Sequence, residues 1–449
     1  MATATKKPKI EEEKSGLEPL ECFLRWCDSV KLTLSDKVYL SKSGTVAEYG
    51  MLAKENIEEG HELFSIPRGA LLHQGTTKVK KVLDEGKKYL ESASGWVPLL
   101  LSLLYEYTSS QSHWKPYLSL WPDFSKLDQP MFWSDKECDD LLRGTGIPEA
   151  VKTDLEKLQE EYTNVVLPFM KSHPELWDPE KHNLELYKNL VAFIMAYSFQ
   201  EPVHEEDDDE DEKEPNSPMM VPMADMLNHV SKHNANLEYT PECLKMVSIH
   251  PIKKGEEVFN TYGQMANWQL LHMYGFTEPF PNNINETADI PMNSAHSEPD
   301  RRLFEEKWKM LCQMEVVGEN SAFIFSQSGC LTYNELYTTL KVLCMSPQEF
   351  KEFSDNEGWE EDDEDDDKME QELSFDGMVA LSRDWKYLLH TAAFLTLASY
   401  HENIEADRKL LEDQEAVELN SRQRRSLHVR YGQKNILQRI FNITKPLAK

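Results

Sequence analysis

The chain has 449 residues with a formal net charge of −31, and 40% of them are hydrophobic, enough for roughly two or three domains with buried cores. So large an excess of acids excludes a general nucleic-acid-binding protein, because phosphate contacts require clustered lysine and arginine. No apolar run approaches the ~20 residues of a membrane-spanning helix, and the first residues lack the apolar stretch of a secretory signal. We therefore expect neither a nucleic-acid partner nor a membrane partner.

The first 70 residues predict one helix followed by short strands. In residues 17–30, apolar side chains recur at i, i+3, i+4 and i+7, which predicts an amphipathic helix. Residues 37–69 contain short apolar runs separated by turn residues such as Gly44, Gly50 and Gly60, a pattern typical of a small antiparallel sheet.

The remaining chain alternates between helical and strand-like patterns. Residues 70–200 are predicted to be mostly helical, and strands return in residues 221–263, followed by a helix over 267–274 that ends at Gly275. Residues 300–449 predict four helices, at 308–316, 333–345, 385–401 and 421–441, the last capped by Asn420 or Ser421.

Two acidic runs interrupt this folded sequence. Residues 201–214 hold ten acids and one lysine, and residues 355–372 hold twelve acids and one lysine. Such dense like charge cannot bury enough surface to offset the entropy of ordering, so we expect disordered loops. They are either solubilising insertions or attractors of a lysine-rich partner.

Four segments hold candidate binding residues: Thr45–Ala53 (TVAEYGMLA), Val221–His229 (VPMADMLNH), Phe259–Gly263 (FNTYG) and Tyr274–Phe276 (YGF). Each combines glycine, amide or tyrosine groups with an apolar run, as a ligand pocket does. Taken singly, each is explained equally well by a turn, a helix cap or an aromatic at the edge of the core.

Other chemistries are poorly supported. His229 and His233 are four residues apart, but there is no HExxH motif and no third ligand, so no metal site is predicted. There is no GxSxG, no GxGxxG and no phosphate-binding loop. The seven cysteines are scattered without a CxxC and indicate reduced thiols.

In their order along the chain, MADMLNH, EVFNTYG and YGF together resemble the SET domain of protein lysine methyltransferases. The helical insertion and the helical C-terminal part resemble the subgroup typified by the plant RuBisCO large-subunit methyltransferase. The resemblance implies an α+β fold, in which short antiparallel SET sheets with a long helical insertion precede an all-α C-terminal domain. The implied parts are a tail and helix at 1–36, a SET domain at 37–285 (insertion about 70–200, acidic loop 201–214) and a helical RuBisCO-methyltransferase-like substrate-binding domain at 300–449 (acidic loop 355–372).

The resemblance also implies S-adenosylmethionine as the methyl donor. Tyr262 of NTYG matches the catalytic tyrosine of the family, and Trp96 and Gln200 fall near the entry of the substrate lysine. The first motif reads EYG here, where many SET domains have GxG. The residues matched to cofactor-binding positions are Ala47, Glu48, Tyr49, Tyr197, Asn228, His229 and Tyr274.

Methyl transfer to lysine requires alignment of donor and acceptor and a neutral amine. A free lysine has a pKa of about 10.4, so a desolvated aromatic channel and a nearby positive sulfonium are needed to lower it. We expect Tyr262 to orient the amine and to stabilise the transition state.

The implied function is protein-lysine N-methylation with monomethylated products, on nuclear proteins such as histones and transcription-factor subunits. The alternative is a catalytically weak SET-fold module that binds basic histone-like segments through the acidic loops. The protein is expected in the nucleus and also in the cytoplasm, and Lys6–Lys9 (KKPK) is either a nuclear import signal or a short basic tail. The oligomeric state is left open.

Overall fold

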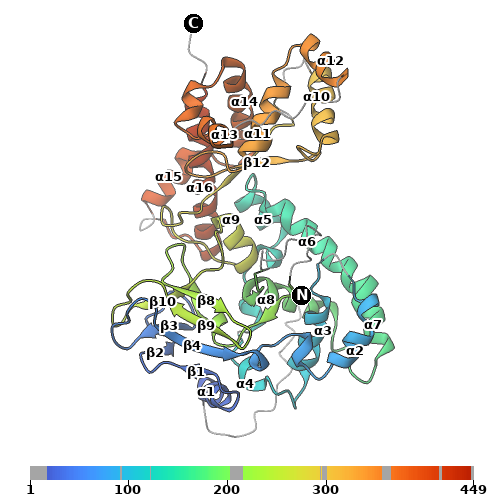
Figure 1. Ribbon diagram of the computed structural model, residues 1–449, viewed down its shortest axis with the longest axis vertical. Coiled ribbons are helices and arrows are strands. Elements are labelled where there is room, and N and C mark those ends of the chain that lie inside the picture. Colours follow the sequence, from blue (N-terminus) through green and yellow to red (C-terminus); the bar gives the residue numbers. More distant parts are fainter. Residues whose placement is uncertain are drawn as a thin grey trace. The chain divides into compact units, whose positions relative to one another are not determined.

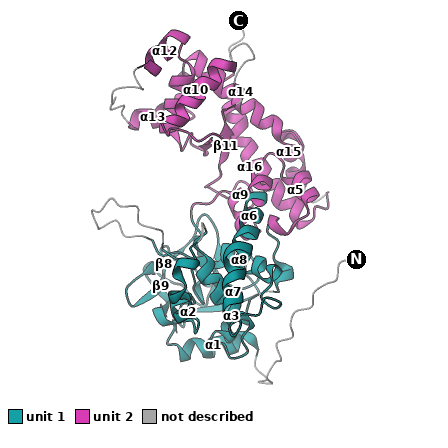
Figure 2. Cartoon of the chain, turned by 90° about the vertical axis from the view of Figure 1, so that its right-hand side faces the viewer, with its two compact units in different colours: residues 1–129, 152–263 teal, residues 130–151, 264–449 magenta. Residues whose placement is uncertain are grey.

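The computed structural model describes residues 18–91, 94–121, 123–202, 216–293, 295, 301–355, 366–413 and 417–445 (Figure 1). The chain forms two compact units, which Figure 2 colours separately. Unit 1 comprises residues 1–129 and 152–263, and unit 2 comprises residues 130–151 and 264–449. The Lys6–Lys9 motif lies outside the described residues.

Unit 1 contains two four-stranded sheets built from short strands. The first sheet is fully antiparallel, and the second has one parallel pair, β10 with β7. This confirms the predicted SET-like sheets, in which β3 buries all four of its residues. In spatial order, the first sheet is β1 (Thr33–Leu34), β4 (Glu62–Pro67), β9 (Cys243–Ser248) and β8 (Ala235–Tyr239), and the second is β2 (Val38–Ser41), β3 (Gly50–Ala53), β10 (Glu257–Asn260) and β7 (Asn228–His229).

Helices surround these sheets, as the periodicity predicts. Helix α1 (Pro19–Ser29) buries Phe23, Trp26 and Cys27 along one stripe. Helix α8 (Leu184–Tyr197) begins where the Asn183 side chain accepts from the Leu186 N–H. The others are α2 (Lys80–Glu85), α3 (Val97–Thr108), α4 (Lys115–Leu118), α6 (Ile147–Glu161, which starts in unit 2) and α7 (Leu167–Ser172), and a small hairpin pairs β5 (Ser198–Phe199) with β6 (Met219–Met220).

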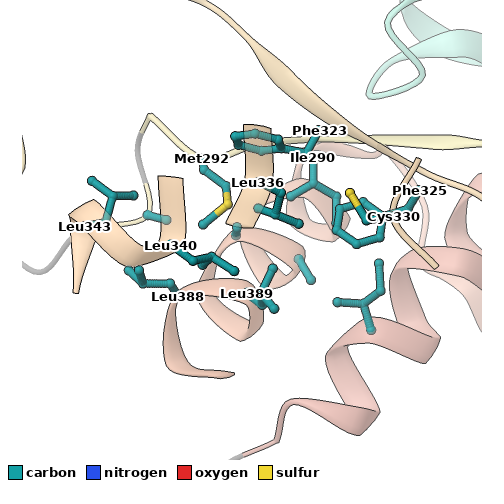
Figure 3. Packing of buried hydrophobic residues seen from close by; sticks show 14 of the residues in the cluster. Ile290, Met292, Phe323, Phe325, Cys330, Leu336, Leu340, Leu343, Leu388 and Leu389 are labelled. Atoms are coloured by element: carbon teal, nitrogen blue, oxygen red, sulfur yellow. The ribbon is translucent and has the colours of Figure 1, made fainter. Parts of the chain in front are cut away.

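The described residues of unit 2 form helices and one two-stranded sheet, so the all-α prediction needs a correction. Strand β11 (Ala288–Pro291) pairs with β12 (Ala322–Phe325), and both contribute to an apolar core with side chains from α11 and α14 (Figure 3). The helices are α5 (Asp135–Leu142), α9 (Asn267–Gln269), α10 (Arg301–Gln313), α11 (Tyr333–Leu343), α12 (Pro347–Asp355), α13 (Asp366–Glu372), α14 (Arg383–Ser399), α15 (Ile404–Glu412) and α16 (Ser421–Ile443). Asn420 caps α16, as predicted.

The prediction of disordered acidic loops is wrong where the runs are described. Residues 366–372 form α13, which is anchored by the buried side chain of Met369. At the other run, Glu201 forms a two-pronged ion pair with Arg68, at 2.6 and 2.8 Å. Residues 203–215 and 356–365 lie outside the described part of the chain. Among the described residues, no helix is long and apolar enough to cross a bilayer.

Candidate functional site

An exposed strap, residues 42–49, connects β2 to β3 and carries three of the predicted cofactor-binding residues. Ala47 and Glu48 are exposed, and Tyr49 is half-buried. The Glu48 carboxylate lies 3.6 and 3.8 Å from the ammonium groups of Lys42 and Lys126. Glu48 is not among the described non-glycine residues with a positive φ, so the EYG motif fits this strap without left-handed strain.

Asn228 fastens this strap to the sheet. It lies on β7, paired in parallel with Phe259 of β10. Its Nδ2 donates to the carbonyls of Tyr49 at 3.1 Å and Ala47 at 3.4 Å, and to Oε1 of Glu257 at 2.7 Å. The structure therefore brings Asn228, Ala47 and Tyr49 together, although about 180 residues separate them in sequence.

Glu257 completes the same network and was missed by the sequence analysis. It is buried on β10, and its Oε2 accepts from the Val46 N–H at 2.8 Å. Burial raises the pKa of its carboxyl, while Asn228 and Val46 lower it. A Cβ on Gly50 would lie 2.4 Å from Oε1 of Glu257, so only glycine allows this approach.

Tyr262 and His229 form the next part of the site. The Tyr262 N–H donates to Nδ1 of His229 at 3.0 Å, and the two rings stack with centroids 5.1 Å apart. The Tyr262 hydroxyl donates to the Leu227 carbonyl at 2.8 Å, which fixes the phenol ring in one orientation. Burial lowers the pKa of His229 to about 4, helped by His233, so the imidazole is neutral at pH 7.

A half-buried acid, Asp225, lies in the same predicted binding segment as Asn228. Asp225 accepts a hydrogen bond from the Tyr117 hydroxyl at 2.5 Å. Within the described chain, its buried Oδ1 atom has no hydrogen-bond partner. Burial raises the pKa of Asp225 to about 7, against which the Tyr117 hydrogen bond acts. The polar residues of VPMADMLNH would have indicated such a group, but not its buried partner 108 residues away.

Tyr197 lies within electrostatic range of Asp225 and of Glu48 on the strap. Its ring stacks on Phe193 with centroids 4.5 Å apart, and Phe193 stacks on Trp121 at 3.9 Å. Burial raises the pKa of Tyr197 to about 12, with further contributions from the charges of Asp225 and Glu48. Tyr197 is thus a neutral phenol within the electrostatic reach of both carboxylates.

The other three predicted residues have their own surroundings. Tyr274 belongs to unit 2, and burial raises its pKa to about 12. Trp96 precedes α3, and its N–H donates to Oγ of Ser94 at 3.1 Å. Gln200 is exposed, and its amide donates to the Asn216 carbonyl at 3.2 Å. The roles given to these and the other site residues stay predictions.

The residues of the unit 1 network fit a cationic cofactor. Glu48, Asp225 and Glu257 contribute carboxyl groups, and the neutral His229 adds no positive charge. The unpartnered Oδ1 of Asp225 favours a cation over an anion. The sulfonium and ammonium groups of S-adenosylmethionine match this set, whereas a phosphate does not. The described residues contain no cluster of three metal-ligating side chains.

Two family models match the chain. Residues 48–263 match the SET domain, and residues 298–437 match a domain described as Rubisco LSMT substrate-binding. The first match begins at Glu48 within the strap and contains Asn228 and Tyr262, and the second lies in unit 2.

Curated relatives match over the full length. The chain is 76% identical to the N-lysine methyltransferase setd6 of Danio rerio, with 100% of both chains covered. It is 46% identical to the N-lysine methyltransferase SETD6 of Homo sapiens, with 99% of this chain and 100% of the relative covered.

Solved structures share the fold. The structure of Rubisco LSMT bound to AdoMet has a TM-score of 0.65 at 20% identity, covering 95% of this chain and 92% of that one. The SET domain of LSMT bound to lysine and AdoHcy has a TM-score of 0.64 at 19% identity, covering 95% of this chain and 90% of that one. At this identity, the likeness concerns the arrangement of the elements.

Proposed function

The chain belongs to the SETD6 family of SET-domain N-lysine methyltransferases, and from that premise we propose that it monomethylates lysines of basic nuclear proteins. The activity itself, S-adenosylmethionine-dependent lysine methylation, follows from the family. The proposal concerns which proteins are modified, how many methyl groups are added and where in the cell this occurs.

When bound, S-adenosylmethionine supplies a methyl group on a positively charged sulfur. The strap residues Ala47, Glu48 and Tyr49 and the side chain of Asn228 would hold it, in the positions that Glu257 and Gly50 fix. A neutral His229 adds no positive charge of its own that would oppose the sulfonium. The Tyr262 hydroxyl can accept an N–H of the lysine amine while it donates to the Leu227 carbonyl.

One observation carries the proposed substrate class, the net charge of −31. A surface so rich in carboxylates attracts lysine- and arginine-rich proteins and raises their rate of encounter. Histones and the basic segments of transcription-factor subunits have this composition. The Lys6–Lys9 motif supports a nuclear location, with the cytoplasm as a second location.

The constraint on Tyr262 supports monomethylation. Its phenol is held from two sides, by the ring stack with His229 and by the bond to Leu227. A fixed hydroxyl can accept an N–H from the amine, but it cannot move away to admit a second methyl group. We infer that the product leaves after one transfer.

The alternative is a weakly active module that binds basic segments through its acidic loops. The ion pair between Glu201 and Arg68 gives this alternative little support. Glu201 begins the first acidic run, and its charge is already paired within the chain. The enzyme is favoured because the strap, Asn228 and Tyr262 form one connected network.

The test is a methylation assay on core histones and transcription-factor subunits with methyl-labelled S-adenosylmethionine, followed by mass spectrometry of the labelled lysines. We expect label on lysine, with a mass increase of one methyl group even at long times. Dimethyl- or trimethyl-lysine would contradict monomethylation. Label on acidic or neutral proteins in preference to basic ones would contradict the substrate class. Binding of histones without transfer would favour the binding module.

A further inference from the structure

Helix α14 of unit 2 carries large apolar side chains on an exposed face. Tyr387, Phe394 and Leu395 have exposed fractions of 50%, 55% and 43%. They are spaced at i, i+7 and i+8, so they lie along one side of the helix. The opposite side of α14 supplies the core residues Leu388, Leu389, Ala392, Ala393 and Thr396.

The apolar surface continues beyond the helix. Val379, in the turn before α14, is 61% exposed, and its carbonyl accepts from the Lys386 ammonium of α14 at 2.5 Å. At the other end, the ring of Phe441 on α16 lies 6.3 Å from the ring of Phe394. We call Val379, Tyr387, Phe394 and Leu395 the α14 stripe. Four exposed apolar side chains on one helix and on the turn before it indicate an interaction site.

Acidic groups lie on the element packed beside this stripe. Helix α13 contacts the turn that holds Val379, and it also contacts α11. Asp366, Asp367 and Glu370 of α13 are exposed. An apolar stripe beside a row of carboxylates complements a partner segment that has aromatic or aliphatic side chains and neighbouring lysines or arginines.

One other occupant fits less well. A second copy of this chain would also carry a charge of −31, so association through this face meets strong repulsion. A basic partner protein does not meet this objection.

We propose that the α14 stripe, together with the acidic face of α13, docks the protein substrate at a segment distinct from the reacting lysine. The inference rests on the proposed substrate class. The stripe lies within residues 298–437, which match the Rubisco LSMT substrate-binding model. Docking there lowers KM for whole basic proteins and leaves the rate of methyl transfer itself unchanged.

The first experiment measures binding to synthetic polymers, which makes it independent of any natural substrate. The full chain is titrated with polylysine and with a longer lysine–tyrosine copolymer that has the same number of lysines. The wild-type chain should bind the copolymer about tenfold more tightly. The double variant Phe394→Ser/Leu395→Ser should lose this preference. The control Tyr89→Ser, which removes an aromatic side chain 79% exposed in unit 1, should keep it.

A separate variant tests the acidic side chains of α13. Asp366→Asn/Asp367→Asn/Glu370→Gln should weaken binding of both polymers several-fold and reduce its dependence on salt. An undiminished copolymer preference in the stripe variant, or an equal loss in Tyr89→Ser, would overturn the proposal. A wild-type dimer that the stripe variant dissociates in analytical ultracentrifugation would assign the stripe to a second copy instead.

A second experiment separates this inference from the proposed function. Initial rates on core histones should give a KM raised about tenfold in the stripe variant, with kcat unchanged. If the wild-type chain transfers no label to histones, the proposed substrate class fails while the polymer preference still decides the stripe. An unchanged KM on labelled histones would overturn the stripe and leave the proposed function standing.

Discussion

Two regions of the molecule bury carboxylates in contrasting ways. Around the strap of unit 1, Glu257 and Asp225 are bonded to neutral donors, namely an amide, a backbone N–H and a phenol. Between α15 and α16 of unit 2, Asp407 is fully buried against two cations, with Arg430 Nη2 at 2.8 Å and Lys434 Nζ at 2.7 Å.

This difference distinguishes carboxylates that can bind a ligand from a carboxylate that is paired within the fold. Neutral donors position a carboxylate without cancelling its charge, so the field of Glu257 and Asp225 remains for a positively charged ligand. Asp407 has its charge compensated within the fold, so its loss would leave two buried cations unpaired, and little of its charge remains for a ligand. Variants can test each half of this contrast.

The largest effect on turnover is expected at Tyr262. Tyr262→Phe keeps the ring stack with His229 and removes the hydroxyl that would orient the lysine amine. We expect kcat to fall by about 10²-fold or more, the range for a lost positioning or proton-handling group. Affinity for S-adenosylmethionine, measured by calorimetry, should change less than about twofold. Tyr39→Phe, on the exposed side of β2, is the matched control, and full turnover in Tyr262→Phe would refute the role.

The next effect concerns the paired cluster of unit 2. Asp407→Asn leaves the buried side chains of Arg430 and Lys434 without their countercharge. Breaking a buried pair in this way costs about 3–5 kcal/mol. Urea denaturation should show that loss in the unfolding of unit 2. Glu405→Gln removes an exposed partner of Arg408 and should cost about 1 kcal/mol at most, so equal losses would contradict the contrast.

Local patterns predicted one part of these regions well. Helix periodicity located α1, α8 and α16, and the motif order located the strap, Asn228 and Tyr262. Glu257 lies only five residues before Tyr262, yet its role depends on β10 pairing with β3, where Glu257 is opposite Leu52. Sequence alone does not give that register, because the two strands are about 200 residues apart.

The errors have a similar origin. Residues 366–372 were predicted as a loop from their charge, but the buried Met369 gives α13 an anchor. Asp366 and Asp367 occupy its first turn, where carboxylates are favourable beside the helix N-terminus. The β11–β12 pair likewise depends on a contact between segments about 35 residues apart. In each case, tertiary contacts determined a helix or strand that the amino-acid composition did not predict.

A tenfold effect is expected where Asn228 fastens the strap. Asn228→Ala removes the donor to Ala47, Tyr49 and Glu257 and leaves a buried carboxylate oxygen without it. The Kd for S-adenosylmethionine should rise about tenfold, which corresponds to ~1.4 kcal/mol. Asn56→Ala is the control, because the Asn56 side chain accepts from the Lys254 N–H in an exposed loop of the same unit. Unchanged affinity in Asn228→Ala would show that the strap keeps its shape without this donor.

The last test follows the uncompensated acid Asp225 through pH. Burial raises the pKa of Asp225 from 3.8 to about 7, so between these values the folded chain binds more protons than the unfolded chain. Its contribution to stability is therefore complete below pH 3.8 and declines as the pH rises to about 7.

Asp225→Asn keeps an oxygen to accept the Tyr117 hydroxyl and removes the titration. From pH 5 to 7, the free energy of unfolding of the wild type should fall relative to the variant, by at most about 1.4 kcal/mol per pH unit. Denaturant titrations at several pH values measure this difference. Parallel curves for the two proteins would mean that Asp225 titrates alike in the folded and unfolded chain. Its charge would then be compensated, as that of Asp407 is, and the contrast between the two regions would no longer hold.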